Sequence, residues 1–179
     1  MSEMYCFQRA QETDIARVME MIEARIRWMD ACGIEQWNKN GYLSAYPEAY
    51  YREELESRRL YVLRGETTKR VYGALVLRES DENWDDGESA LYVNNLVADL
   101  HEKGAGLYML SFCDVLARAK GKSYLRLDCD KSNEKLNRYY ALQGFVAVGE
   151  CTDGPYTGIR RQKDLTKGCN CCSSEQKTE

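Results

Sequence analysis

The order of strand-like and helix-like segments constrains the fold of this chain more than any other feature. Three segments rich in β-favouring apolar residues follow one another at 60–64, 71–78 and 90–98, and the first two flank the turn-rich run GETTKR. Beyond residue 98, helical and extended patterns alternate. An antiparallel meander that continues into β-α-β crossovers predicts an α/β (α+β) sandwich, in which helices cover a mixed sheet.

Helical periodicity, together with helix start and stop signals, places the remaining elements. Apolar side chains recur at helical spacing from Ile15 onward, Thr13 fits the N-cap before them, and Gly33 fits the stop. Pro47 fits the start of a second helix of about ten residues, and the aromatic stretch before it is predicted to be a loop. The other expected elements are strands at 5–9, 124–129, 145–150 and 156–163 and helices at 107–120 and 133–143.

The length of 179 residues fits one domain, which we place at 1–166. The polar tail, 167–179, holds Cys169, Cys171 and Cys172 and is expected to be disordered. Three thiols without a neighbouring histidine are one ligand short of a closed zinc site, so we predict no bound metal. The other five cysteines are scattered through core-like segments and are expected to behave as small buried hydrophobes: Cys6, Cys32, Cys113, Cys129 and Cys151.

Charge and hydropathy bear on location and partners. The formal net charge of −4 gives no general attraction to phosphate backbones, which argues against a nucleic-acid partner. No run approaches the roughly 20 apolar residues of a membrane span, and the N-terminus lacks the pattern of a signal peptide. We therefore expect a cytoplasmic protein without nucleic-acid or membrane partners, and a homodimer stays open.

The first informative motif is the glycine-containing run His101-Glu102-Lys103-Gly104-Ala105-Gly106 between an expected strand and an expected helix. The glycines let the backbone turn and approach a ligand closely. The first amides of a helix lack partners and point with its dipole toward an anion, which suits a pyrophosphate. Alone, the run is more often a simple turn. It matches neither the dinucleotide-binding nor the P-loop pattern.

The second motif lies one β-α unit later, in the expected helix 133–143. Asn133 and Tyr140 are seven residues apart, so their side chains share one helix face, whereas Tyr139 is turned away and expected to be packed. Gly144 lets the chain leave the helix and Phe145 opens the next strand. For a single Asn–Tyr pair, an exposed amphipathic helix is the simpler interpretation.

Together the two motifs closely resemble those of the GNAT superfamily of N-acetyltransferases. The family's phosphate loop, Gln/Arg-x-x-Gly-x-Gly/Ala, is matched by His101-x-x-Gly104-x-Gly106. Its later pattern, Asn-x-x-Ala-x-x-x-Tyr followed by Gly-Phe, is matched at Asn133 and Tyr140 and by Gly144 with the phenylalanine after it. The resemblance in element order extends from Tyr5 to Lys163. It implies a mixed, mostly antiparallel sheet of six to seven strands flanked by about four helices.

The resemblance also implies roles for particular residues, with acetyl-CoA as the acyl-donor substrate. The strand backbone at Asn95, Leu96 and Val97 would pair with the pantetheine arm. Asn133 would hydrogen-bond acetyl-CoA, and Tyr140 would lie beside its sulfur, where a phenol can protonate the leaving thiolate as general acid. The pyrophosphate would bind the amides of Glu102, Lys103, Gly104, Ala105 and Gly106.

Two departures from the family pattern matter. His101 replaces the usual Gln or Arg, so a side-chain contact with phosphate from this position is in doubt, although backbone amides need no particular side chain. Leu136 replaces the common small residue in the helix, which would narrow the cleft.

The acceptor end is less constrained by sequence. Gln36 and Trp37 lie in the region that shapes the acceptor pocket in GNAT enzymes, and an aromatic face there would suit a cation. We expect Trp28 to pack in the core. The general base stays open among four carboxylates, each of which is more often simply solvated: Asp128, Asp130, Glu35 and Glu79.

We therefore expect an acetyl-CoA-dependent N-acetyltransferase that acts on a primary amine of a small molecule by direct attack on the thioester. One alternative is a protein or peptide N-acetyltransferase, which an open acidic groove would favour over a closed aromatic pocket. The other is a non-catalytic acyl-CoA-binding module, which would not need Tyr140.

Overall fold

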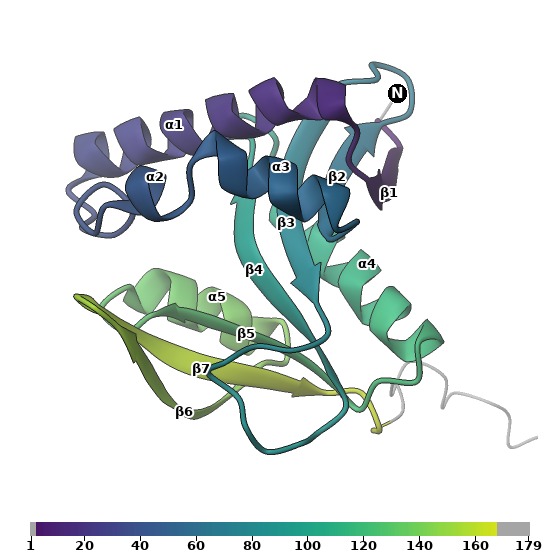
Figure 1. Ribbon diagram of the computed structural model, residues 1–179, viewed down its shortest axis with the longest axis vertical. Coiled ribbons are helices and arrows are strands. Elements are labelled where there is room, and N and C mark those ends of the chain that lie inside the picture. The colour runs from purple at the N-terminus through teal and green to yellow at the C-terminus, as the bar shows by residue number, and fades with distance from the viewer. Residues whose placement is uncertain (1–2, 168–179) are drawn as a thin grey trace, which may run out of the picture.

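The computed structural model describes residues 3–167, and its centre is a single mixed sheet (Figure 1). Within the described residues, the strand order is β1-β2-β3-β4-β5-β7-β6, and every neighbouring pair is antiparallel except β4 and β5. The strands are β1 (Tyr5–Arg9), β2 (Leu60–Gly65), β3 (Val71–Arg78), β4 (Ala90–Ala98), β5 (Tyr124–Asp130), β6 (Val146–Asp153) and β7 (Tyr156–Asp164). The helices are α1 (Ile15–Cys32), α2 (Tyr42–Ala45), α3 (Glu48–Glu56), α4 (Ala105–Ala119) and α5 (Glu134–Leu142).

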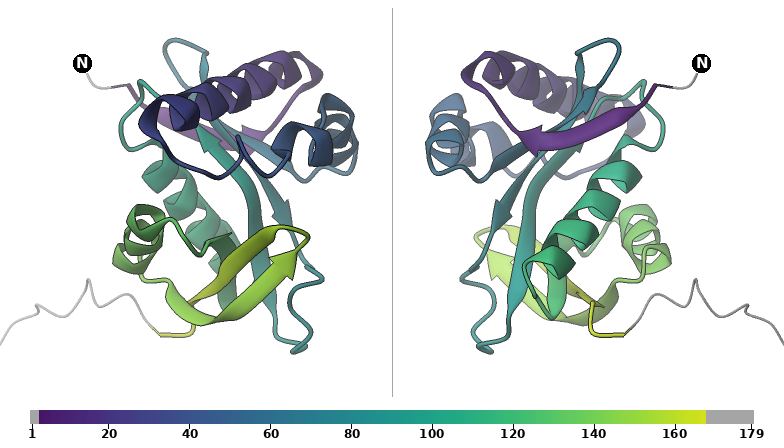
Figure 2. Two further views of the ribbon diagram at one scale, coloured as in Figure 1. Left: turned by 90° about the vertical axis from the view of Figure 1, so that its left-hand side faces the viewer. Right: turned by 90° about the vertical axis from the view of Figure 1, so that its right-hand side faces the viewer.

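The helices cover the two faces of the sheet. Figure 2 shows α3 and α4 on opposite sides of β3 and β4. Alternate residues of β3 supply both cores: Ala74 and Val76 pack with α1 and α3, whereas Leu75 and Leu77 pack with α4. A strand buried on both faces is apolar throughout, which explains the nearly continuous run VYGALVLR. This arrangement confirms the predicted α/β sandwich.

The parallel pair β4 and β5 is joined over only part of its length. The register runs from Ala90 opposite Tyr124 to Tyr92 opposite Arg126, and no pairing of these two strands extends beyond it among the described residues. Past this point the two strands separate (Figure 1). A bulge in β4 accompanies the separation, with Asn95 in the left-handed region at φ 52°. The sheet is therefore split at its centre.

The helix boundaries correct two expectations. Thr13 is not the N-cap of α1: it lies in a 3-10 turn, Glu12–Asp14, and the cap is Asp14. The Asp14 carboxylate caps this turn by accepting the Gln11 amide (2.9 Å), and it also accepts a hydrogen bond from the distant Arg64 (2.6 Å). The aromatic stretch expected to be a loop contains the one-turn helix α2. Gly33 ends α1 at φ 66°, as predicted.

The cysteines only partly match expectation. Cys113 and Cys129 are buried and Cys6 and Cys151 are half-buried, but Cys32 is exposed at the end of α1. All five are free thiols. The tail with its three cysteines lies outside the described residues from position 168 on. Between residues 3 and 167, no group of three or more metal-ligating side chains is found, and no helix is long and apolar enough to cross a bilayer.

Candidate active site

A cavity of about 750 Å³ occupies the split between β4 and β5. Its lining comes from the end of α1 and the segment after it, the second half of β4, the glycine loop before α4, the end of β5, α5, and the β6–β7 hairpin. Because α4 and α5 cover one sheet face and α1 and α3 the other, this lining reaches through the sheet from one layer to the other. One continuous space thus joins the two predicted halves of the site.

The glycine loop forms one end of the cavity. Gly104 has φ 88° and stands immediately before α4, so the chain enters the helix through a conformation that favours glycine. The Asp99 side chain starts the loop by accepting the His101 amide at 2.8 Å. Among the described residues, no acceptor is found for four amide groups at this helix start, those of Lys103, Gly104, Gly106 and Leu107. Unpaired donors at the positive end of a 15-residue helix suit an anionic group.

Two of the five amides predicted to bind the pyrophosphate, those of Glu102 and Ala105, instead donate to the backbone carbonyls of Asp99 (3.3 Å) and Glu102 (3.5 Å), because the loop turns back on itself before α4. Tyr5 donates a hydrogen bond to the Glu102 carboxylate, which holds that negative charge in a defined place. His101 is exposed and is not among the cavity-lining residues. The structure therefore gives the imidazole no place in the cavity wall.

The bulged strand β4 forms the adjoining wall. Asn95 and Leu96 line the cavity, but the Val97 side chain is buried in the core beneath α1 and is not part of the lining. The Asn95 side chain accepts a hydrogen bond from the Tyr50 hydroxyl at its Oδ1 (2.8 Å) and donates one from its Nδ2 to the Tyr42 hydroxyl (2.8 Å). These bonds tie the bulge to α2 and α3.

The start of α5 carries Asn133, which is the N-cap of that helix. Its side-chain oxygen accepts the Leu136 amide at 3.0 Å and its nitrogen donates to Gln36 at 2.9 Å. Asn133, predicted to bind acetyl-CoA, and Gln36, predicted to bind the acceptor amine, are thus hydrogen-bonded to each other. Leu136 also lines the cavity, as its position in the motif implied.

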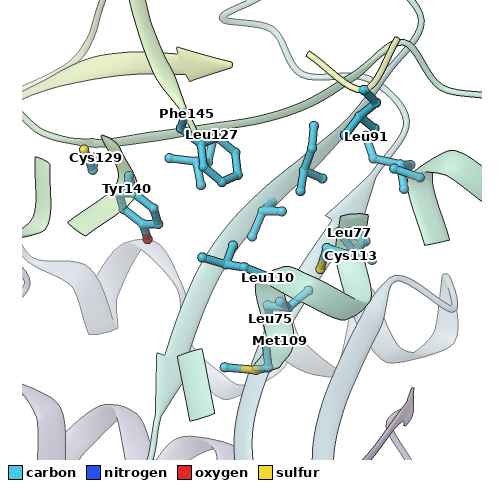
Figure 3. Packing of buried hydrophobic residues seen from close by; sticks show 14 of the residues in the cluster. Leu75, Leu77, Leu91, Met109, Leu110, Cys113, Leu127, Cys129, Tyr140 and Phe145 are labelled. Carbon is cyan, nitrogen blue, oxygen red and sulfur yellow. The ribbon is translucent and has the colours of Figure 1, made fainter. Parts of the chain in front are cut away.

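Tyr140 of α5 is a buried residue that lines the cavity. Its ring is buried against Phe145, with the centroids 5.9 Å apart, and in Figure 3 its oxygen points away from Phe145 and Leu127. Tyr140 lines the cavity and, within residues 3–167, its hydroxyl makes no hydrogen bond. Burial raises the pKa of Tyr140, so the phenol stays protonated at neutral pH. It is a free proton donor beside an apolar wall.

Tyr139 was expected to face away from the site, and this is wrong. It lines the cavity beside Tyr140, with its hydroxyl 3.3 Å from where a Cβ on Gly106 would lie. Tyr139 and Tyr140 lie on adjoining faces of α5, and the cavity borders both faces. Helical spacing alone does not show how much of a helix a cavity borders.

The far end of the cavity is aromatic. Trp37 stacks on Tyr42 with centroids 4.2 Å apart, and Tyr42 packs against Tyr46 at 4.8 Å. Trp37 lines the cavity as predicted, and the buried Gln36 lies beside it. Trp28 was expected in the core, but it is 39% exposed and lines the cavity, with the Arg25 guanidinium 5.0 Å from its ring centroid.

The four candidate bases occupy different environments. Asp128 and Asp130 line the cavity, whereas Glu35 and Glu79 are exposed and do not. Asp130 caps a turn by accepting the amide and hydroxyl of Ser132 (2.8 and 2.5 Å). Glu79 pairs with two lysines of the α4–β5 connection, which lowers its pKa to about 2.

Several lining residues escaped prediction from sequence. Tyr46 and Tyr156 lie 110 positions apart in the chain and meet at this cavity only through the tertiary fold. Tyr46 at least belongs to an aromatic-rich stretch, which is a signal for a pocket wall. Tyr156 follows a Gly-Pro turn, and nothing local marks it as part of a site.

Comparisons with known proteins identify the fold. No family model matches the chain, and no curated protein matches it by sequence. A GNAT-family acetyltransferase from Listeria monocytogenes superposes with a TM-score of 0.72 at 22% identity, over 92% of this chain and 98% of that one. A GNAT-family acetyltransferase from Streptococcus agalactiae gives 0.73 at 16% identity, over 89% and 95%. Ard1 from Thermoplasma volcanium gives 0.65 at 13% identity, over 89% and 97%. The protein has the fold of the GNAT acetyltransferases.

Proposed function

We propose that this protein is an acetyl-CoA-dependent N-acetyltransferase that acts on a primary amine of a small molecule. The observation that carries the proposal is the continuous cavity through the split sheet, which joins a helix start with unpaired amides to an aromatic and acidic pocket and is also lined by the protonated Tyr140. The shared GNAT fold supports the class of reaction.

The donor end fits acetyl-CoA, whose acetyl thioester supplies the group to be transferred. The four unpaired amides at the start of α4, those of Lys103, Gly104, Gly106 and Leu107, would hold the pyrophosphate. The β4 backbone at 95–97 lies at the edge of the split, where no β5 residue is paired with it, and would bind the pantetheine amides. Asn133 would contribute a hydrogen bond from the opposite wall.

The chemistry assigned to Tyr140 follows from its environment. An amine that attacks a thioester carbonyl leaves a thiolate, which must gain a proton. The Tyr140 hydroxyl faces the cavity without a partner and remains protonated, so it is suited to give that proton. Cys129 is also a lining residue, but its buried thiol donates a hydrogen bond to Asn137 (3.3 Å), and burial raises its pKa to about 11, which makes it a poor nucleophile. Direct transfer between the two substrates is therefore favoured over an acetyl-cysteine route.

The acceptor end favours a small amine over a peptide. The rings of Trp37, Tyr42 and Tyr46 wall it from one side and Tyr156 of the β6–β7 hairpin from another. Stacked rings and nearby carboxylates attract a cation, which suits the ammonium group of a small amine. Tyr140, which a pure acyl-CoA-binding module would not need, favours an enzyme.

Two measurements test the proposal. Isothermal calorimetry should detect acetyl-CoA binding, and mass spectrometry of a panel of small primary amines mixed with acetyl-CoA should reveal an acetylated product. Product masses are preferable to thiol reagents because the chain has eight cysteines of its own. A peptide with a free N-terminus belongs in the same panel. Acetylation of the peptide alone, or no binding of acetyl-CoA, would contradict the proposal.

A further inference from the structure

The carboxylate of Asp128 occupies a distinctive place in the cavity. It lies in the second half of β5, past the point where this strand leaves β4, and its chain neighbour Cys129 faces the core that holds Tyr140. Asp128 lines the acceptor end together with Tyr156, Asp153 and Tyr46. The proposed acid and this carboxylate therefore reach one space from opposite sides of β5.

The carboxylate is held in a fixed position. The Tyr156 hydroxyl donates a hydrogen bond of 2.5 Å to Asp128 Oδ2. Both groups lie over Gly158: a Cβ there would come within 2.7 Å of the Tyr156 hydroxyl and 3.0 Å of Asp128 Oδ2. A glycine at this position of β7 therefore leaves room for the pair. Within residues 3–167, the only side chain that donates a hydrogen bond to this carboxylate is Tyr156, and Asp128's own backbone amide also contributes one.

No ion pair with a cationic side chain is found for this carboxylate in the part of the chain that the structure describes. Arg160 is its cross-strand neighbour on β7, but the guanidinium donates to the Asn83 carbonyl (2.6 Å) and lies over the Trp84 ring. Burial raises the pKa of Asp128, the negative charge of Asp81 raises it further, and the Tyr156 hydrogen bond lowers it. The titratable groups whose charges interact with that of Asp128 are Tyr46, Asp81, Cys129, Tyr140, Cys151 and Tyr156.

We propose that Asp128 is the general base that takes the proton from the acceptor's ammonium group, with Tyr156 as the residue that positions it. This inference rests on the proposed acetyltransferase function. The acceptor enters with three N–H protons and keeps one in the amide. One proton passes to Asp128 Oδ1 before the nitrogen attacks the thioester carbonyl, and then leaves to solvent. As the C–N bond forms and the C–S bond breaks, the thiolate takes the Tyr140 proton, and the second proton lost by nitrogen restores that phenol.

The first test compares two carboxylate-to-amide variants. Asp128→Asn keeps the size of the side chain and removes its basicity, so kcat should fall by about 10²–10⁴-fold. Acetyl-CoA affinity, measured by calorimetry, should stay within about threefold of wild type because Asp128 lies away from the glycine loop. The matched control is Glu79→Gln, an exposed carboxylate outside the cavity, which should retain wild-type kcat.

The second test uses a pH profile, which a merely structural role would not move. The Tyr156 hydrogen bond lowers the pKa of Asp128, so Tyr156→Phe should raise it. Because the base must be ionised, the acidic limb of kcat should then shift to higher pH than in wild type. Using one acceptor for both proteins removes the acceptor's own titration from the comparison.

The outcomes separate this inference from the function on which it rests. An active wild type with an Asp128→Asn variant that keeps kcat within about threefold would overturn Asp128 as base. An unmoved acidic limb in Tyr156→Phe would overturn the positioning role. A wild-type protein that binds acetyl-CoA but acetylates no amine would overturn the proposed function, and the base with it.

Discussion

Replacing Tyr140 by phenylalanine removes one hydroxyl group and leaves the ring in place. The ring packs edge-on against Phe145 at 5.9 Å, and its hydroxyl has no hydrogen-bond partner among the described residues, so the substitution breaks no internal bond. Stability should change little. A positioned general acid contributes about 10²–10⁴ in rate, which corresponds to about 2.7–5.4 kcal/mol of transition-state stabilisation.

The assay is steady-state acetylation of the best amine from the panel. For Tyr140→Phe we expect kcat to fall within that range and the Michaelis constant for acetyl-CoA to stay unchanged, as when an interaction made only in the transition state is lost. Tyr61→Phe, a tyrosine outside the cavity, is the matched control. Tyr139→Phe separates the two cavity tyrosines and should affect turnover far less. Full activity of Tyr140→Phe, or equal losses in the two variants, would refute Tyr140 as the acid.

Three further predictions follow from the two ends of the cavity. Gly104→Val places a β-branched side chain at φ 88° and beside the free amides, so acetyl-CoA binding measured by calorimetry should be lost. Circular dichroism checks that the variant is folded, and unchanged affinity in a folded variant would contradict the anion site. His101→Ala should change acetyl-CoA affinity by less than about tenfold, or about 1.4 kcal/mol, because the imidazole is outside the cavity wall; a larger loss would mean that it contacts the phosphates. Trp37→Ala should raise the Michaelis constant for the amine several-fold and leave acetyl-CoA affinity intact, and the reverse pattern would place Trp37 at the donor end.

The sequence predicted those features that depend on local backbone chemistry. Strands with a strong apolar pattern, such as 71–78 and 90–98, were predicted with the bounds that the structure gives. Gly33 and Gly104 adopt the left-handed conformation that favours glycine, and each marks a helix end. Glycine at a helix end is informative because few other residues accept positive φ.

Features that depend on distant partners were not predicted. Asp14, the N-cap residue of α1, is buried and paired with Arg64, which lies fifty residues away in the chain. Trp28 was expected to pack in the core, yet it lies on the wall of the cavity that occupies the split in the sheet. The sequence did not distinguish Asp128 from the other three candidate bases. Its 2.5 Å hydrogen bond with Tyr156 of the β6–β7 hairpin is a tertiary contact that no local pattern predicts. Periodicity records which face of an element is apolar and carries no information on what lies opposite that face.

Initial rates measured with acetyl-CoA and the acceptor amine both varied test the central claim most directly. One cavity that would hold both substrates, lined by a protonated Tyr140 and by Cys129, whose thiol is also protonated, predicts transfer within a complex of enzyme, acetyl-CoA and amine. The double-reciprocal lines should therefore intersect, and incubation with acetyl-CoA alone should leave the mass of the protein unchanged. Parallel lines together with an acetylated protein would contradict direct transfer through this cavity.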